Sequence, residues 1–223
     1  MQELELDPRS RSHRLRELFW SGAHESYRQS QLVVGSDDPS LVGKARDFEA
    51  LLEATPAVMQ PGDLLAGISL VVPAEGSSID LGEYDGHYTP GHANILRLGL
   101  TGIRDRAREK LADQTDPAKR DFLEAAAIAY EAARRFAEKH AVHAGQLAAE
   151  TADLERQQEL VRAAAACGEL ATGAPTSFQA GLQALWFTFL FGGRGSIGRF
   201  DQWMYPLYRA DVEANRLITE QAQ

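Results

Sequence analysis

The chain has 223 residues, of which 44% are hydrophobic and 25% charged, and its formal net charge is −9. This composition is typical of a globular protein and excludes a fully disordered or collagen-like chain. An acidic chain is also poorly suited to a nucleic-acid backbone, because that binding depends on lysines and arginines that neutralise phosphates. We therefore expect no nucleic-acid partner.

The first residues and the longest apolar run argue against export and membrane insertion. The sequence begins MQELELDPRS, which lacks the basic start and the apolar core of a signal peptide. The longest strongly apolar run covers residues 185–191 and is far shorter than the ~20 residues that a membrane helix needs. The single cysteine, Cys167, cannot form an internal disulfide. These features predict a cytoplasmic protein with no membrane partner.

Helical periodicity dominates the first part of the chain. Apolar residues at helical spacing predict one helix from about 9 to 34. The dipeptide Asp38-Pro39 predicts the start of a second helix, with Asp38 as its N-cap. Residues 64–72 (LLAGISLVV) are a short apolar run rich in β-branched residues, which predicts a strand buried on both faces. A long loop over 73–92 follows, and loops of this length usually either carry function or lack order.

The rest of the chain is predicted to be almost wholly helical. Asp116-Pro117 repeats the N-cap signature, and Thr176 with Gln179 matches a capping box. Further helices are predicted at about 95–112, 117–149, 154–170 and 201–214. Because the predicted strand has no strong partner strand in the sequence, its backbone groups need partners from elsewhere. We expect one continuous unit that is mostly α with one or two short strands.

A glycine-rich stretch near the C-terminal end matches the spacing of a dinucleotide-binding fingerprint. Gly193, Gly195 and Gly198 have the GxGxxG pattern. An apolar helix precedes them instead of a strand, however, and the acidic residue arrives far too early, at Asp201. The pattern therefore favours the end of a helix followed by an irregular connection.

Two further features have the residue types of a site but lack its context. His140 and His143 lie three residues apart on a predicted helix, but the chain contains no Glu-x-x-His and no other ligand set, so no metal site is predicted. Cys167 lies in an alanine-rich helix without a basic neighbour, which favours a small packed side chain over a nucleophile.

Two clusters remain candidates for contact with a substrate. His87 and His92 lie in the glycine-rich loop beside carboxylates, where a histidine can act as an acid, a base or a hydrogen-bond donor, or can simply be solvated. Arg199 and Asp201 follow the second glycine-rich stretch. They can pair with each other, or Arg199 can hold a substrate carboxylate through two parallel hydrogen bonds. The residues themselves leave both interpretations open.

Four sequence blocks occur in an order that one family shares. They are PGDLLAG at 61–67, GHYTP with LGLTGI within 86–103, TSFQAGLQALWF at 176–187, and SIGRFDQWMYPLY with Asp211 at 196–211. With these blocks the chain resembles the N-terminal part of the glycyl radical enzymes. That group contains pyruvate formate-lyase (formate acetyltransferase) and the glycerol and choline type dehydratases and lyases.

The resemblance implies that residues 1–223 form the N-terminal portion of the family's ten-stranded α/β barrel, with the barrel incomplete. In the family, a radical SAM activating enzyme installs a glycyl radical, which generates a thiyl radical on a catalytic cysteine. Both sites come after the matched region, and Cys167 does not align with the catalytic loop. The resemblance thus implies a chain that ends before the cysteine loop and the glycyl radical domain, and that binds no cofactor itself. It also implies that His87, Arg199 and Asp201 face a small substrate.

Three hypotheses follow. The first is a fragment of a formate acetyltransferase or diol dehydratase type enzyme, active only when a second chain completes the barrel. The partner expected is that second chain, which carries the rest of the barrel, or further copies of this chain in a homo-oligomer. The second is a non-catalytic helical module that binds a glycyl radical enzyme or its activating enzyme. The third is an independent helical enzyme that uses His87. An uncovered half-barrel also predicts exposed apolar surface around 64–72 and 185–191, and therefore self-association.

Overall fold

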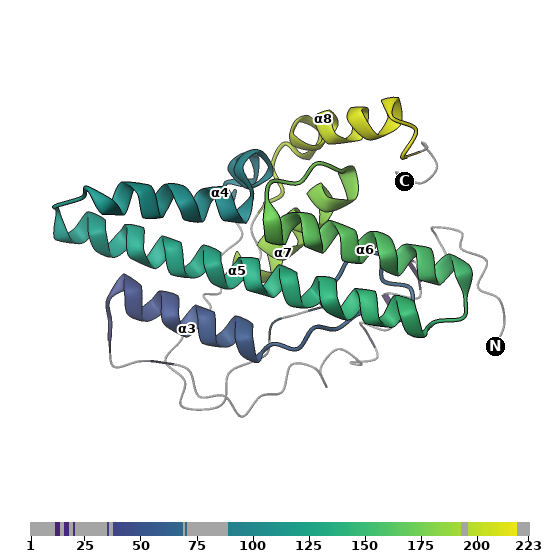
Figure 1. The fold of residues 1–223 in the computed structure, drawn as a ribbon, viewed down its shortest axis with the longest axis horizontal. Coiled ribbons are helices and arrows are strands. Elements are labelled where there is room, and N and C mark those ends of the chain that lie inside the picture. The colour runs from purple at the N-terminus through teal and green to yellow at the C-terminus, as the bar shows by residue number, and fades with distance from the viewer. Residues whose placement is uncertain are drawn as a thin grey trace.

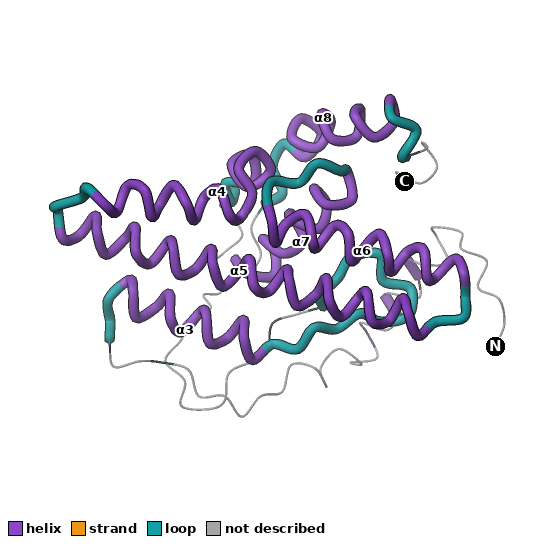
Figure 2. Tube along the Cα trace, viewed as in Figure 1, coloured by secondary structure: helices purple, strands orange, loops and turns teal. Residues whose placement is uncertain are grey.

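A computed structural model describes residues 12–13, 16–17, 20, 35, 38–68, 70, 89–192 and 196–217. Within these ranges the ordered elements are helices, and no strand occurs (Figures 1 and 2). The helices are α3 (Leu41–Ala54), α4 (His92–Ala112), α5 (Pro117–Glu150), α6 (Leu154–Thr172), α7 (Phe178–Gly192) and α8 (Phe200–Glu213). Most of the helix expected over 9–34 lies outside the described residues.

The long helix α5 organises the fold. Its 34 residues span about 51 Å at 1.5 Å per residue. Figure 1 shows α4 along the N-terminal half of α5 and α6 along its C-terminal half, with α3 on the opposite side from α4. Helix α7 packs against α6 and α4, and α8 lies at the rim against α7 and the start of α4. The chain therefore builds a helical layer on α5 and places α8 outermost.

The core lies where α5, α6 and α7 meet. Phe136 of α5 packs edge-on against Phe187 of α7, with ring centroids 5.2 Å apart. Small residues such as Ala137 and Ala163, both fully buried, bring α5 and α6 close together. Cys167 is fully buried in the same cluster, which confirms its assignment as a packed side chain.

Polar contacts fix α3 to α5. Arg135 of α5 binds the carboxylates of Glu49 and Glu53. The Lys139 ammonium donates to the backbone carbonyls of Leu52 and Thr55 at the C-terminal end of α3. A lysine in that place satisfies carbonyls that have no partner within the helix and complements the negative end of its dipole.

The strand predicted over 64–72 is wrong for the described residues 64–68 and 70, which are irregular. The side chain of Gln183 in α7 pairs with both backbone groups of Ala66: its oxygen accepts from the N–H at 2.8 Å, and its nitrogen donates to the carbonyl at 2.9 Å. Trp186 Nε1 donates to the carbonyl of Gly67 at 2.7 Å. These side chains replace a neighbouring strand as hydrogen-bond partners, so the segment needs no sheet.

The exposed apolar surface expected around the same segment and around 185–191 is confirmed at Leu64, which is 42% exposed, and is wrong at four other described positions. Ala66 and Phe187 are almost completely buried, and Leu70 and Leu185 are buried too. Segment 64–67 lies against α7, so the two apolar stretches cover each other. Partly exposed apolar side chains remain on α7 at Trp186, Leu190 and Phe191.

Two of the three predicted N-caps are displaced along the chain. Asp116 caps α5 by accepting from the N–H groups of Ala118 and Lys119, as predicted. Helix α3, however, is capped by Ser40, because Asp38 instead accepts from the N–H of Ser40. At α7 the hydroxyl of Ser177 accepts from the N–H of Ala180, one residue later than the predicted box.

Candidate functional site

The candidate site lies at the N-terminal end of α8. Arg199 is the N-cap residue of this helix, and Asp201 is in its first turn. Both side chains are exposed, and no ion pair joins them in the described structure. The backbone carbonyl of Arg199 accepts from the N–H groups of Gln202 and Trp203, which starts the helix. The two side chains are therefore free to meet a group outside this chain.

The segment before α8 lies against the segment before α4. Gly198 has a φ of 65°, in the left-handed region that favours glycine. A methyl group added there would come 2.6 Å from the Trp203 ring and 2.9 Å from the Thr89 side chain. The close approach of these two segments therefore requires glycine at position 198. It places Thr89 next to Gly198, the residue that precedes Arg199.

His87 lies in residues 71–88, outside the described residues, so its predicted role stays a prediction. The described residues resume at Thr89, two residues further along the chain. Arg199 and Asp201 lie on one helix end, and Thr89 contacts the turn just before it. The described ends of these two segments therefore meet at the start of α8.

His92 is a buried component of the same region. It begins α4, is 1% exposed, and its ring lies 5.3 Å from that of Trp203. Burial lowers the pKa of His92, an effect that the backbone of Ser196 partly offsets. Since the charged form is disfavoured, His92 serves here as a packed neutral ring that joins α4 to α8. Sequence reasoning grouped it with the loop because it lies next to Gly91.

The N-terminal end of α7 is held by two carboxylates from other helices. Glu169 of α6 accepts from the backbone N–H groups of Thr176 and Ser177 at 2.6 and 3.2 Å. Asp211 of α8 accepts from the N–H of Phe178 at 2.7 Å. Carboxylates are favourable at this positive end of the helix dipole. Because Asp211 belongs to α8, this contact also positions the helix that carries Arg199 and Asp201.

These carboxylates were not singled out as caps by the sequence reasoning. In the sequence Asp211 belongs to the block at 196–211, and Glu169 belongs to none of the four blocks. No local signal could have identified them, because a cap from another helix depends on how the helices pack and not on spacing along the chain. Gly181 supplies a related signal: a methyl group there would come 2.6 Å from Leu207 and 2.8 Å from Met204, so α7 and α8 touch closely.

The described residues offer neither a metal centre nor a reactive thiol. No three His, Cys, Asp or Glu side chains in the described ranges gather as metal ligands. Burial raises the pKa of the Cys167 thiol to about 12, so the thiol stays protonated and has no access to a substrate. His140 is also buried, and its pKa is lowered by burial to about 4.

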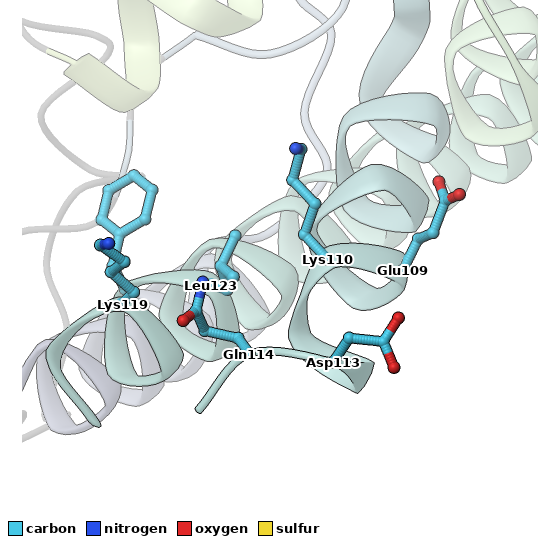
Figure 3. A pocket seen from close by; sticks show the side chains of 7 residues that line it. Glu109, Lys110, Asp113, Gln114, Lys119 and Leu123 are labelled. Atoms are coloured by element: carbon cyan, nitrogen blue, oxygen red, sulfur yellow. The ribbon is translucent and has the colours of Figure 1, made fainter. Parts of the chain in front are cut away.

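A hollow of about 460 Å³ lies at the turn between α4 and α5 (Figure 3). Its lining mixes acidic, basic and apolar side chains: Glu109, Lys110, Asp113, Gln114, Lys119, Phe122 and Leu123. It lies near the C-terminal end of α4, whereas the candidate site lies near the N-terminal end of that helix, beyond a kink at Gly99. The hollow is therefore separate from Arg199 and Asp201.

None of the helices in the described ranges is both long enough and apolar enough to cross a bilayer.

Comparison with protein families gives one match, described as pyruvate formate lyase-like, over residues 81–223. This range is over half of the chain and contains Arg199, Asp201 and the two carboxylates, Glu169 and Asp211, that hold the start of α7.

Curated proteins with similar sequences cover the same part. The isethionate sulfite-lyase of Oleidesulfovibrio alaskensis is 34% identical over 144 residues, which is 59% of this chain and 17% of that protein. The (2S)-3-sulfopropanediol dehydratase of Klebsiella oxytoca is 34% identical over 147 residues, or 60% of this chain and 18% of that protein. The chain thus spans less than a fifth of the length of these relatives.

Solved structures match over nearly the whole chain. A structure described as 1,2-propanediol dehydration in Roseburia inulinivorans aligns with a TM-score of 0.71 and 20% identity, covering 93% of this chain and 36% of that one. The B12-independent glycerol dehydratase of Clostridium butyricum aligns with a TM-score of 0.69 and 20% identity, covering 92% and 35%. At this identity the likeness establishes the fold: the helices described above correspond to part of a larger enzyme fold.

Proposed function

The chain belongs to the pyruvate formate lyase-like family, and from this membership we propose that it forms part of a glycyl radical lyase or dehydratase. The observation that carries the proposal is the match over residues 81–223, with 34% identity to two named relatives. One relative is named for releasing sulfite from isethionate and the other for dehydrating a sulfopropanediol. We therefore favour an elimination from a small polar substrate over acetyl transfer.

The radical chemistry itself does not fit the residues that the structure describes. The one cysteine of the chain is fully buried between helices, and its thiol is held in the protonated form. No radical step is therefore assigned to this chain. We place the catalytic cysteine and the radical glycine outside these 223 residues, in the part that makes up the remaining length of the relatives. A glycyl radical would be installed there by a radical SAM activating enzyme.

The proposed contribution of this chain is a wall of the substrate chamber. The exposed guanidinium of Arg199 can bind two oxygens of one anionic group, and Asp201 offers an acceptor two residues along. His87 is proposed as the third contact. The approach of Thr89 to Gly198 supports this grouping, because Thr89 is two residues after His87 in the sequence and Gly198 precedes Arg199.

A chimeric enzyme tests the proposal. Residues 81–223 replace the matching residues of the O. alaskensis isethionate sulfite-lyase, and the chimera is activated without oxygen by that enzyme's own activating partner. We expect a glycyl radical signal in electron paramagnetic resonance and release of sulfite. Arg199→Ala is expected to reduce kcat/KM for isethionate by at least tenfold, about 1.4 kcal/mol of transition-state stabilisation. Arg106→Ala, an exposed arginine on α4, serves as the matched control.

Two outcomes contradict the proposal at different points. A folded chimera that carries the radical but releases no sulfite argues against the assigned reaction class. If Arg199→Ala and Arg106→Ala lower the kcat/KM of the chimera equally, the result argues against a contact between Arg199 and the substrate.

The alternative is a non-catalytic helical module that binds a glycyl radical enzyme or its activating enzyme. The exposure of both Arg199 and Asp201 fits this alternative as well, since exposed charges also suit a protein interface. The same chimera separates the two, because a module without a catalytic role cannot restore turnover. Under either hypothesis the purified chain without a catalytic partner is expected to release no sulfite, and turnover by it would overturn both.

A further inference from the structure

Helix α4 begins with a histidine whose ring nitrogens have no hydrogen-bond partner in the described structure. The side chain of His92 is 1% exposed, and neither Nδ1 nor Nε2 meets the geometry of a hydrogen bond. A neutral imidazole carries one N–H donor and one acceptor nitrogen, and a buried donor without a partner destabilises the fold. Buried polar groups in native proteins rarely stay unpaired, so packing alone does not account for a histidine at this position.

The ring contact of His92 does not require its nitrogens. The His92 ring lies against the Trp203 ring of α8, with the ring centroids 5.3 Å apart and the planes tilted by 51°. A phenylalanine ring could make the same kind of contact without burying a polar atom. The feature that separates histidine from phenylalanine here is therefore the hydrogen-bonding capacity of the ring.

The backbone of Ser196 is the polar group of the described residues that acts on the His92 ring. It favours the charged form of the ring, as a carbonyl oxygen near a ring nitrogen does, although the contact falls outside hydrogen-bond geometry. Burial is the larger effect and lowers the pKa of His92 below its ordinary value of 6.5, so the ring is neutral at pH 7 and carries one N–H. The Ser196 carbonyl is therefore the acceptor available to that N–H.

Ser196 begins the short segment 196–198, which leads directly into Arg199. The hydrogen bond found within this segment runs from the Gly198 N–H to the Ser196 hydroxyl at 3.1 Å, so it joins the segment only to itself. Arg199, the N-cap residue of α8, has no side-chain hydrogen bond that caps the helix. A hydrogen bond from His92 to the Ser196 carbonyl would give this segment a polar link to α4.

We propose that His92 is a positioning residue of the candidate site, whose imidazole N–H donates to the Ser196 carbonyl and thereby fixes where the chain enters α8 and where the Arg199 guanidinium lies. The inference rests on the proposed chamber wall, because Arg199 is the group that is positioned. His92 itself does not touch the substrate, since its ring is almost completely buried. A misplacement of about 1 Å at a substrate-binding group can lower activity by up to about 100-fold.

Nuclear magnetic resonance of the full chain tests the hydrogen bond. A long-range ¹H–¹⁵N correlation spectrum at pH 7 is expected to show a neutral His92 ring with a slowly exchanging N–H. His92→Phe should shift the ¹³C′ resonance of Ser196, because the carbonyl loses its donor. His143→Phe replaces a partly exposed histidine on α5 and should leave that resonance unchanged. A rapidly exchanging His92 N–H, together with a Ser196 resonance that His92→Phe does not move, overturns the proposal.

The chimeric enzyme described above separates positioning from packing. His92→Phe keeps a ring against Trp203, so the urea midpoint of the full chain should stay the same or rise. In the chimera, the same change should raise the KM for isethionate about fivefold and change kcat less, because the binding of the substrate is what Arg199 supplies. His92→Gln and His92→Asn return an N–H at two different reaches, and one of them should recover part of the lost affinity. His143→Phe is again the control.

The outcomes distinguish this inference from the proposed function. A wild-type chimera that carries the radical but releases no sulfite contradicts the proposed function, and the resonance of Ser196 in the full chain still decides on the hydrogen bond. An active chimera whose KM is unchanged by His92→Phe overturns the positioning role and leaves the proposed function standing. A His92→Phe variant that loses stability and activity together also overturns that role, because His92 then acts through packing alone.

Discussion

The carboxylate of Asp211 in α8 accepts a hydrogen bond of 2.7 Å from the backbone N–H of Phe178, the first residue of α7. Its other oxygen accepts from the guanidinium of Arg216 at 2.6 and 2.9 Å. One buried side chain thus caps a helix and forms an ion pair. Asp211 holds α8 against α7. Because Arg199 and Asp201 lie at the start of α8, their placement depends on this side chain.

Removing that carboxylate is expected to destabilise the protein. Asp211→Ala leaves the N–H of Phe178 and the guanidinium of Arg216 without their partner, and should lower the free energy of unfolding by about 2–3 kcal/mol. Asp211→Asn keeps an acceptor and should lose less. Urea denaturation measures both. Glu213→Ala, which removes an exposed pair on the same helix, is the control; an equal effect of the two alanine variants would refute the structural role of Asp211.

The pairing of Gln183 with Ala66 makes a second prediction. Gln183→Met keeps the side-chain volume but leaves a buried N–H and a buried carbonyl unpaired, which should cost about 2–4 kcal/mol of unfolding free energy. Hydrogen exchange of the Ala66 amide should become much faster. Gln179→Ala, which removes a 3.2 Å bond to Leu64 near the surface, should have a small effect. Unchanged exchange at Ala66 in the methionine variant would contradict this account.

Gly67 and Gly62 form a matched pair of positive-φ glycines. Their φ angles are 86° and 94°, so alanine is strained at both, by about 1 kcal/mol. At Gly67 a methyl group would also lie 3.2 Å from Phe187 and Leu190, whereas at Gly62 nothing lies within 4 Å. Gly67→Ala should therefore reduce the melting temperature more than Gly62→Ala. Equal reductions in melting temperature would mean that Phe187 and Leu190 can move away from the added methyl group at little cost.

His140 predicts a loss of stability in acid. Its pKa is lowered by burial to about 4 in the folded protein, from 6.5 when exposed. Between these values the unfolded chain binds more protons, so the stability contribution present above pH 6.5 is lost as the pH falls towards 4, up to about 3 kcal/mol. His140→Phe, which keeps an aromatic ring beside Phe136 but removes the titrating group, should make stability less dependent on pH in this window. Identical pH profiles for the variant and the wild type would exclude this origin.

Cys167 predicts a silent thiol. Because the side chain is fully buried and its pKa is raised to about 12, iodoacetamide at pH 8 should leave the folded protein unmodified and should label it fully in denaturant. Mass spectrometry measures the extent of labelling. Rapid labelling of the folded chain would mean that the α6 core opens often, and would reopen the question of a chemical role for this residue.

Some features of the fold were predictable because their causes are local. Asp116, followed by a helix-forming stretch of 34 residues that begins with Pro117, specifies where α5 begins and how long it is. The start of α8 near Asp201 follows in the same way. Where two local signals compete, as for Asp38 against Ser40 or Thr176 against Ser177, spacing along the chain does not decide between them, and the two helix starts shifted.

The sequence by itself determined the helices, the family blocks and the placing of Arg199 and Asp201 on one helix end, because each depends on neighbours within a few residues. The tertiary structure decided that 64–67 is held by Gln183 and Trp186 rather than by a strand, that Asp211 caps α7, and that Thr89 lies against Gly198. Each of these contacts joins residues far apart in the chain. A buried backbone group can form its hydrogen bond with any suitable partner that packing brings within reach. The pattern of residues along the sequence does not specify which partner this is.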